Sequence, residues 1–357
     1  MSIRRRALTV GVSALAAVAA TASRGRAQTG TIVGQVRVAG TRLPLGYAVV
    51  SAAPTASASR EIFSDDEGRF VLRSVPAGSV RLSARRVGFS PADTTIFVAR
   101  GDTSRVIIEL SLVSIQLPPV QSLAKVCAHP GGSDAQIGEQ LAALFDQVKE
   151  NAARNQLLSR SYPFELEVER RISRPEPILE ARFVAYDTVV RSSNREWRYE
   201  PGKMLGTREY TGGVFAGKWA TITVPELADF ADERFLINHC FEFGGLEVVD
   251  GDSVIRVDFS PAPVVHDLDI AGTIFLDPVS YQLRVMDIAV VNLNRQLRSQ
   301  ISGQSIRSHF REVIPGVPVL SAISSMVFPK EDPKRPGQEP STEHHRILSV
   351  RFLHGKP

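Results

Sequence analysis

The stretch from Ser64 to Phe89 constrains the fold more than any other part of this 357-residue sequence. Within it, residues 69–73 and 80–85 alternate apolar and polar side chains, as a β-strand with one buried face requires. Asp-Asp-Glu-Gly at 65–68 and Pro-Ala-Gly at 76–78 are turn sequences, because proline presets one φ angle and glycine admits a positive one. We therefore predict two short strands of a small β-sandwich.

The same alternation continues on both sides of this stretch. Further short strands are predicted at 32–38, 47–53, 60–63, 94–98 and 106–112. Seven short strands with frequent turns between them are typical of a sandwich of about eighty residues.

Motifs within residues 30–112 resemble the carboxypeptidase regulatory-like domain. They are Gly34-x-Val36, Pro44-Leu45-x-x-Ala48-x-Val50, Asp66-x-Gly68-x-Phe70-x-Leu72-x-x-Val75-Pro76-x-Gly78 and Gly88-Phe89. The resemblance implies a seven-stranded, transthyretin-like sandwich of the carbohydrate-binding-like kind. Such domains occur beside peptidases, on outer-membrane receptors and on many secreted proteins, so the resemblance implies a fold and no chemistry.

The N-terminus has the three parts of an export signal. Arg4, Arg5 and Arg6 precede an apolar run at 7–22, and small residues lead to Ala27. We predict a signal peptide at 1–27, cleaved between Ala27 and Gln28, and a protein in the periplasm, the cell envelope or the medium. The consecutive arginines leave the twin-arginine route open beside the general one. No membrane-spanning segment is predicted in the mature chain.

Loss of the signal peptide changes the charge of the chain. The sequence has 42 Lys and Arg against 38 Asp and Glu, and the signal peptide carries five arginines and no acid. The mature chain therefore has a net charge of about −1, and the pI near 9.2 belongs to the precursor. This charge gives no reason to expect nucleic-acid binding.

The chain contains two cysteines, Cys127 and Cys240, both after the signal peptide. An even number of cysteines in an oxidising compartment favours a disulfide. The chain-entropy model assigns such a long loop up to about 4–5 kcal/mol of stabilisation. Two buried thiols that never meet are the alternative.

After a linker predicted at 113–130, the second region (131–357) starts with a helix. Ser133 and Gln136 form a capping box, and apolar residues at helical spacing extend the helix over 133–158. Strands are then predicted at 162–171, 178–190, 194–199, 219–224, 241–249, 253–259, 270–276, 282–291, 304–313, 320–327 and 343–352, with short helices within 225–237. The fold class is therefore mainly β: a sandwich followed by a curved antiparallel sheet with one main packed helix.

This second region resembles the C-terminal part of secreted bacterial proteins that carry the same regulatory-like domain. The resemblance lies in Cys127, the following helix, Phe235-x-x-x-His239-Cys240-Phe241 and Ala271-Gly272-Thr273-Ile274-Phe275-Leu276-Asp277. It implies a two-domain plan and a Cys127–Cys240 pair, and it implies no activity.

His239 and Glu242 form the H-x-x-E string of zinc carboxypeptidases, with His344 or His345 as a third ligand. No glutamate follows at 346–357 to act as general base, and the region lacks the βαβ alternation of that fold. A thiol nucleophile at Cys240 is disfavoured, because neighbouring residues on a strand point to opposite faces.

Several charged groups remain as candidate sites. They are Asp65-Asp66, Asp267 with Asp269, the strand face of Glu165, Glu167 and Glu169, and the basic patch of Arg81, Arg85 and Arg86. The aspartates are expected to be solvated, with a calcium site or a hydrolase as alternatives, and the glutamate face is expected to be solvated, with a cation or partner site as the alternative. The basic patch is expected to aid solubility or to meet an anionic envelope partner.

We therefore predict an exported, non-catalytic cell-envelope protein with no cofactor, no metal and no catalytic residue. It would bind a protein partner or a glycan, through loops such as Pro54–Ser59 and the concave face of the second domain. One alternative is a periplasmic carrier of a hydrophobic ligand, whose concave sheet face the helix would leave unfilled. The other is the zinc carboxypeptidase.

Overall fold

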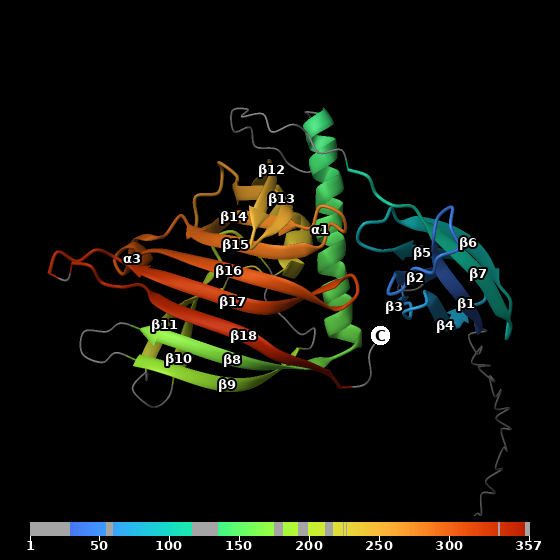
Figure 1. The fold of residues 1–357 in the computed structure, drawn as a ribbon, viewed down its shortest axis with the longest axis horizontal. Coiled ribbons are helices and arrows are strands. Elements are labelled where there is room, and N and C mark those ends of the chain that lie inside the picture. Colours follow the sequence, from blue (N-terminus) through green and yellow to red (C-terminus); the bar gives the residue numbers. More distant parts are fainter. Residues whose placement is uncertain are drawn as a thin grey trace, which may run out of the picture.

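The computed structural model describes residues 29–54, 60–115, 135–174, 181–191, 199–210, 217–223, 225, 227–334 and 336–353 (Figure 1). The predicted signal peptide with its Ala27-Gln28 cleavage site, most of the Pro54–Ser59 loop, and Cys127 lie outside these ranges. The protein is mainly β, as predicted.

The first part of the chain is a sandwich of two sheets, with strand orders β4-β1-β7 and β3-β2-β5-β6. The strands are β1 (Thr29–Val38), β2 (Val49–Pro54), β3 (Arg60–Phe63), β4 (Arg69–Pro76), β5 (Gly78–Arg85), β6 (Ala92–Val98) and β7 (Thr103–Leu110). β1 pairs antiparallel with β4 and parallel with β7. Inward side chains of both sheets, such as Ile32, Leu72 and Leu82, form one buried core.

The turn between β3 and β4 shows why this stretch folds as its sequence predicts. Oδ1 of Asp65 accepts hydrogen bonds from the backbone N–H groups of Glu67 and Arg69, at 3.0 and 2.7 Å. Gly68 has a φ of 74°, and a Cβ there would collide with the carbonyl oxygen of Val36. Only glycine fits this combination of positive φ and close approach.

The second part is a nine-stranded sheet in the order β12-β13-β14-β15-β16-β17-β18-β8-β9, antiparallel throughout, with one long helix, α1 (Ala135–Ser161). Its strands are β8 (Phe164–Arg174), β9 (Ala181–Arg191), β12 (His239–Val249), β13 (Asp252–Pro261), β14 (Asp269–Leu276), β15 (Leu283–Val291), β16 (Ile301–Ile314), β17 (Val317–Pro329) and β18 (Ser341–Phe352). β10 (Leu205–Tyr210) and β11 (Gly217–Ile222) form a separate pair, and η1 (Leu227–Ala231), α2 (Glu233–Ile237) and α3 (Arg295–Arg298) are short helices. Sequence analysis missed β10 and α3, and the strand predicted at 194–199 falls almost entirely outside the described ranges.

Helix α1 lies between the sandwich and the nine-stranded sheet (Figure 1). Leu144, Phe145 and Val148 join the core of the sheet, and Val87 of the sandwich belongs to the same cluster. Leu157 and Leu158 join a second cluster that also contains Val49 and Phe63 of the sandwich. Each such side chain contributes about 1.5–3 kcal/mol when fully buried, so apolar packing fixes the sandwich to the helix.

None of the helices in the described ranges combines the length and the apolarity that a membrane crossing requires.

Candidate functional site

A groove of about 950 Å³ lies on the outer face of the β4-β1-β7 sheet. Outward side chains of the three strands form its floor: Val33, Gln35, Arg69, Val71, Arg105 and Ile107. Ile62, Phe63, Asp65 and Tyr162 line the remaining wall. We define these residues as the groove.

The strand register arranges the floor in two cross-strand rows. Val33 pairs with Val71 on one side and with Arg105 on the other, and Gln35 pairs in the same way with Arg69 and Ile107. Val71 is 43% exposed and Ile107 is 55% exposed. Apolar side chains gathered on a sheet face beside a cation are typical of an interaction surface, whereas single exposed ones are common everywhere.

The polar groups at one edge of the groove are held in place by each other. Nε2 of Gln35 donates to the carbonyl oxygen of Glu67 at 2.9 Å, and Nε of Arg69 lies 2.9 Å from Oδ2 of Asp65. Partial burial alone would raise the pKa of Asp65, but hydrogen bonds from the backbone and side chain of Arg69 outweigh it and lower that pKa. Within the described ranges no ion pair involves Arg105, so its guanidinium is available to a ligand.

Tyr162, from the second part of the chain, forms part of the groove wall. This half-buried residue directly follows α1, and its ring centroid lies 5.9 Å from that of Phe63 in β3. Burial raises the pKa of Tyr162, against the effect of a backbone hydrogen bond from Phe63. Sequence reasoning placed Tyr162 at the start of a strand, and no local pattern relates it to a residue about a hundred positions earlier.

The residues proposed for a zinc site do not come together. His239 is fully buried, with Nδ1 2.9 Å from the carbonyl oxygen of Phe235 and Nε2 3.3 Å from Oδ1 of Asp269. Its strand, β12, is six steps from β18 in the sheet order, and steps of about 4.8 Å separate the two by roughly 29 Å along the sheet.

The other residues proposed for the zinc site either contact neighbouring side chains or are exposed to solvent. Glu242 is exposed, Nδ1 of His344 lies 2.9 Å from Oγ of Ser324, and Nε2 of His345 lies 2.7 Å from Oε1 of Glu343. No group of three or more potential metal ligands occurs in the part of the chain that the structure describes. The zinc carboxypeptidase alternative therefore has no support from this geometry.

The predicted disulfide involves one residue outside the described ranges. Cys240 lies on β12 opposite Ser260 of β13, next to the buried His239. Because Cys127 lies outside those ranges, the Cys127–Cys240 pair stays a prediction.

The predicted basic patch is wrong. Arg81 bonds to Asp93 at 2.7 Å, and Arg85 bonds to Glu61 and to Glu150 of α1, each at 2.9 Å. Burial lowers the pKa of Arg86. The patch is lost because Asp93 pairs with the exposed Arg81, and because α1 covers the Arg85 end of this face and supplies a carboxylate to Arg85.

The glutamates on the acidic face of β8 contact side chains of the neighbouring strand. Glu165 bonds to Arg351, Oε2 of Glu167 accepts from Oγ of Ser349 at 3.1 Å, and Oε2 of Glu169 lies 3.5 Å from Nη2 of Arg346. These partners all belong to the neighbouring strand, β18. The acids therefore form cross-strand pairs, and this geometry gives no support to the alternative of a cation site on that face.

The two aspartates at the start of β14 also differ in environment. Asp269 is fully buried and accepts from the hydroxyl of Tyr199 at 2.6 Å and from the N–H of Ile270 at 2.8 Å, whereas Asp267 is exposed. Burial and, after it, the hydrogen bond to Asp269 raise the pKa of Tyr199. Asp269 is thus a buried structural acceptor.

The face of the nine-stranded sheet that packs on α1 is filled where the helix crosses it. Phe145 contacts Phe241 of β12, with ring centroids 4.2 Å apart, inside the cluster that also holds Val148 and Ile274. The hydrophobic-carrier alternative requires an apolar face that the helix leaves open. This packing therefore argues against it.

Comparison with known proteins identifies the first domain. The model of the carboxypeptidase regulatory-like domain matches residues 31–111, and these residues form such a domain. This domain and the groove on it fit a non-catalytic binding role. None of the curated proteins matches this chain.

Three solved structures are similar in part. They are the minor pilin GBS52 of Streptococcus agalactiae (18% identity, 26% of this chain and 49% of that chain, TM-score 0.23), the LolA superfamily protein NE2245 of Nitrosomonas europaea (11%, 59% and 94%, 0.30) and a DUF3823 family protein of Parabacteroides merdae (10%, 66% and 97%, 0.21). This chain thus spans about half the length of the pilin. With TM-scores this low, the similarities support no inference about function.

Proposed function

We propose that this protein is an exported, non-catalytic cell-envelope protein that binds a segment of a partner protein in the groove. The segment would present a carboxylate beside apolar side chains. The signal peptide predicted at 1–27 supports export, and the chemistry of the groove supports the choice of ligand.

A repeated row of side chains carries this proposal. The row Val71–Val33–Arg105, which we name the open row, lies across β4, β1 and β7. The row Phe63–Val49–Arg85, which we name the covered row, lies across β3, β2 and β5. Each row consists of an apolar residue, a valine and an arginine.

The contacts of helix α1 with the covered row support this choice of ligand. Leu157 and Leu158 pack in one cluster with Phe63 and Val49, and Glu150 places Oε2 2.9 Å from Nη1 of Arg85. A ligand that binds the open row in the same way needs apolar side chains for Val71 and Val33 and a carboxylate for Arg105. Guanidinium and carboxylate groups form strong charge-assisted hydrogen bonds.

The test is selection of peptides from a random library on the mature protein, followed by affinity measurements with Val71→Asp. The control is Val264→Asp, since Val264 is 80% exposed and belongs to the second domain. We expect the selected peptides to be rich in acidic and apolar residues. Val71→Asp should weaken binding by about tenfold or more, which is about 1.4 kcal/mol, and Val264→Asp should leave it unchanged.

Two outcomes would reject the proposal. Binding of glycans from an array, lost in Val71→Asp while no peptide binds, would make the ligand a glycan. Turnover of peptide or ester substrates that disappears in His239→Ala would make the protein an enzyme.

A further inference from the structure

We infer that the groove is composite, and that Arg154 of α1 is the positioning residue that holds its Tyr162 wall against the sandwich. The role in ligand binding rests on the proposed function, whereas the positioning itself is a property of the protein without ligand. It follows that the regulatory-like domain alone is an incomplete binding unit.

The helix sets the position of Tyr162. Its N–H donates to the carbonyl oxygen of Leu158 at 2.8 Å, so the helical hydrogen bonding continues to this residue. Arg154 comes eight residues earlier, which is about two helical turns, and it lies on the same side of the helix. Any shift of α1 against the sandwich therefore moves Tyr162 relative to the groove floor.

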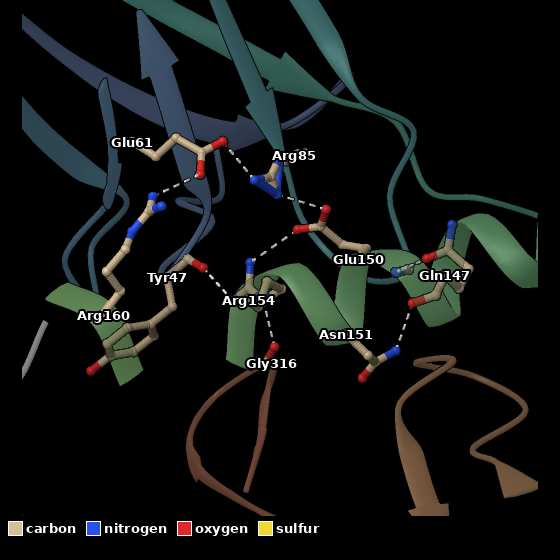
Figure 2. Close-up of polar contacts among 10 residues, drawn as sticks. Tyr47, Glu61, Arg85, Gln147, Glu150, Asn151, Arg154, Arg160 and Gly316 are labelled. Carbon is tan, nitrogen blue, oxygen red and sulfur yellow. Dashed lines mark hydrogen bonds and ion pairs between the residues drawn. The ribbon is translucent and has the colours of Figure 1, made fainter. Parts of the chain in front are cut away.

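Arg154 binds both domains with one side chain. Its Nη2 donates to the carbonyl oxygen of Tyr47 in the sandwich, and its Nε donates to that of Gly316 in the β16–β17 turn, each at 2.5 Å (Figure 2). Its guanidinium carbon lies 5.3 Å from the centroid of the Phe63 ring. The same ring contacts Tyr162, so Arg154, Phe63 and Tyr162 form a continuous set of contacts from the helix to the groove.

An ion pair with Glu150 on the same helix adds to these contacts of Arg154. Arg154 is fully buried, and burial lowers its pKa to about 9, so it keeps its charge at neutral pH. Its Nη1 lies 3.8 Å from Oε1 of Glu150. Glu150 binds Arg85 of β5, which in turn binds Glu61 of β3, so ion pairs extend from α1 into the sandwich (Figure 2).

Two side-chain amides of α1 form hydrogen bonds with backbone groups outside the helix. Oε1 of Gln147 accepts from the N–H of Gly88 at 2.7 Å, and Nδ2 of Asn151 donates to the carbonyl oxygen of Tyr281 at 3.0 Å. These amides orient the helix near its middle. Arg154 is nearer to Tyr162 than these two amides and contacts both the sandwich and the β16–β17 turn, so its loss should affect the groove more than theirs.

The experiment places 3-fluorotyrosine at position 162 of the full chain and records its ¹⁹F resonance in Arg154→Met and Arg160→Met. Arg160 is the matched control, because it is on the same helix, is 59% exposed and lies 4.0 Å from its nearest acid, Glu61. We expect the Arg160→Met resonance to coincide with wild type. In Arg154→Met, the resonance should move toward that of the solvated amino acid. The affinity of this variant for the selected peptides should fall by about tenfold.

A second variant keeps the inference testable if Arg154→Met does not fold. Arg154→Lys retains the charge but has one ammonium group, which cannot span both carbonyl oxygens as the planar guanidinium does, so the same direction of shift is expected.

The outcomes separate this inference from the proposed function. An unchanged ¹⁹F resonance in folded Arg154 variants would overturn the positioning role. A moved resonance with unchanged peptide affinity would overturn the composite groove. If no peptide binds wild type, the proposed function fails, and the resonance still decides whether Arg154 positions Tyr162.

Discussion

The two outer faces of the sandwich carry similar side chains and differ in what covers them. The covered row, Phe63–Val49–Arg85, is buried under α1, and its arginine is bound by carboxylates from α1 and β3. The open row, Val71–Val33–Arg105, forms the floor of a groove. The comparison teaches that the chain itself covers one of two similar apolar–valine–arginine rows, and the proposed function assigns the other row to a partner.

The largest effect on the free energy of unfolding is expected when the charged side chain that holds α1 on the covered face, Arg154, is removed. Arg154→Met leaves the carbonyl oxygens of Tyr47 and Gly316 without their buried donor, while Glu150 keeps its ion pair with Arg85. Removing one member of a buried charge network costs about 3–5 kcal/mol, which urea unfolding should show.

Arg160→Met is the control for this measurement. Its long contact with Glu61 is exposed, so a change below about 0.5 kcal/mol is expected. Equal effects of the two substitutions would show that the covered face does not depend on Arg154.

The next effect compares one valine of the covered row, Val49, with one valine of the open row, Val71. Val49 is fully buried, so Val49→Ala should lower the free energy of unfolding by about 2 kcal/mol through lost apolar contact and a cavity. Val71 is 43% exposed, so Val71→Ala should change it by less than about 0.5 kcal/mol. A large loss of stability in Val71→Ala would mean that the open row already has an intramolecular cover.

A smaller, pH-dependent effect concerns the turn that packs on Gly88 of the sandwich. Partial burial of Asp277 favours its neutral form, but hydrogen bonds from Ser280, Arg284 and Val279 outweigh this and hold its pKa below 3.8. The folded state therefore prefers the carboxylate. Its stabilising contribution is present above the ordinary pKa and is lost as the pH falls below about 3.8, through the folded-state pKa.

Asp277→Asn should thus lower the free energy of unfolding at neutral pH, measured by urea denaturation, by about 0.5–1 kcal/mol after allowance for solvent screening. The difference from wild type should disappear in strong acid. A difference that stays constant down to strong acid would show that the lost stability does not come from the ionised carboxylate.

The smallest effect is expected where charges pair on the exposed sheet face. Glu167→Gln should change the free energy of unfolding by less than about 0.5 kcal/mol, because its contact with Ser349 is exposed. Added calcium should not change the melting temperature of wild type. A calcium-dependent rise in melting temperature that Glu167→Gln abolishes would show that this face binds a cation. It would also show that exposed charges can matter as much for stability as the charges covered by α1.

Sequence analysis predicted the sandwich well because its signals are local. Alternation with period two places Phe70 and Leu72 inside, and the Asp65–Gly68 turn connects β3 and β4 as the sequence indicates. The capping box and the helical spacing predicted a helix at 133–158, close to the observed Ala135–Ser161. Both patterns depend on residues within a few positions of each other.

The groove wall and its support could not be predicted in the same way. Gln147 and Glu150 follow a polar helical pattern that normally faces solvent, yet Gln147 is buried against the sandwich and Glu150 binds Arg85, sixty-five residues earlier. A polar stripe of a helix becomes an interface only when a second domain supplies partners for it. That information lies in the domain arrangement and not in any local pattern.

Hydrogen–deuterium exchange of the full chain, with and without a selected acidic peptide, tests the central claim most directly. The account predicts slower exchange in β4 and β7, the two outer strands of the three that carry the open row, and no change in β12 to β15. Slower exchange in the nine-stranded sheet with β4 and β7 unchanged would contradict it.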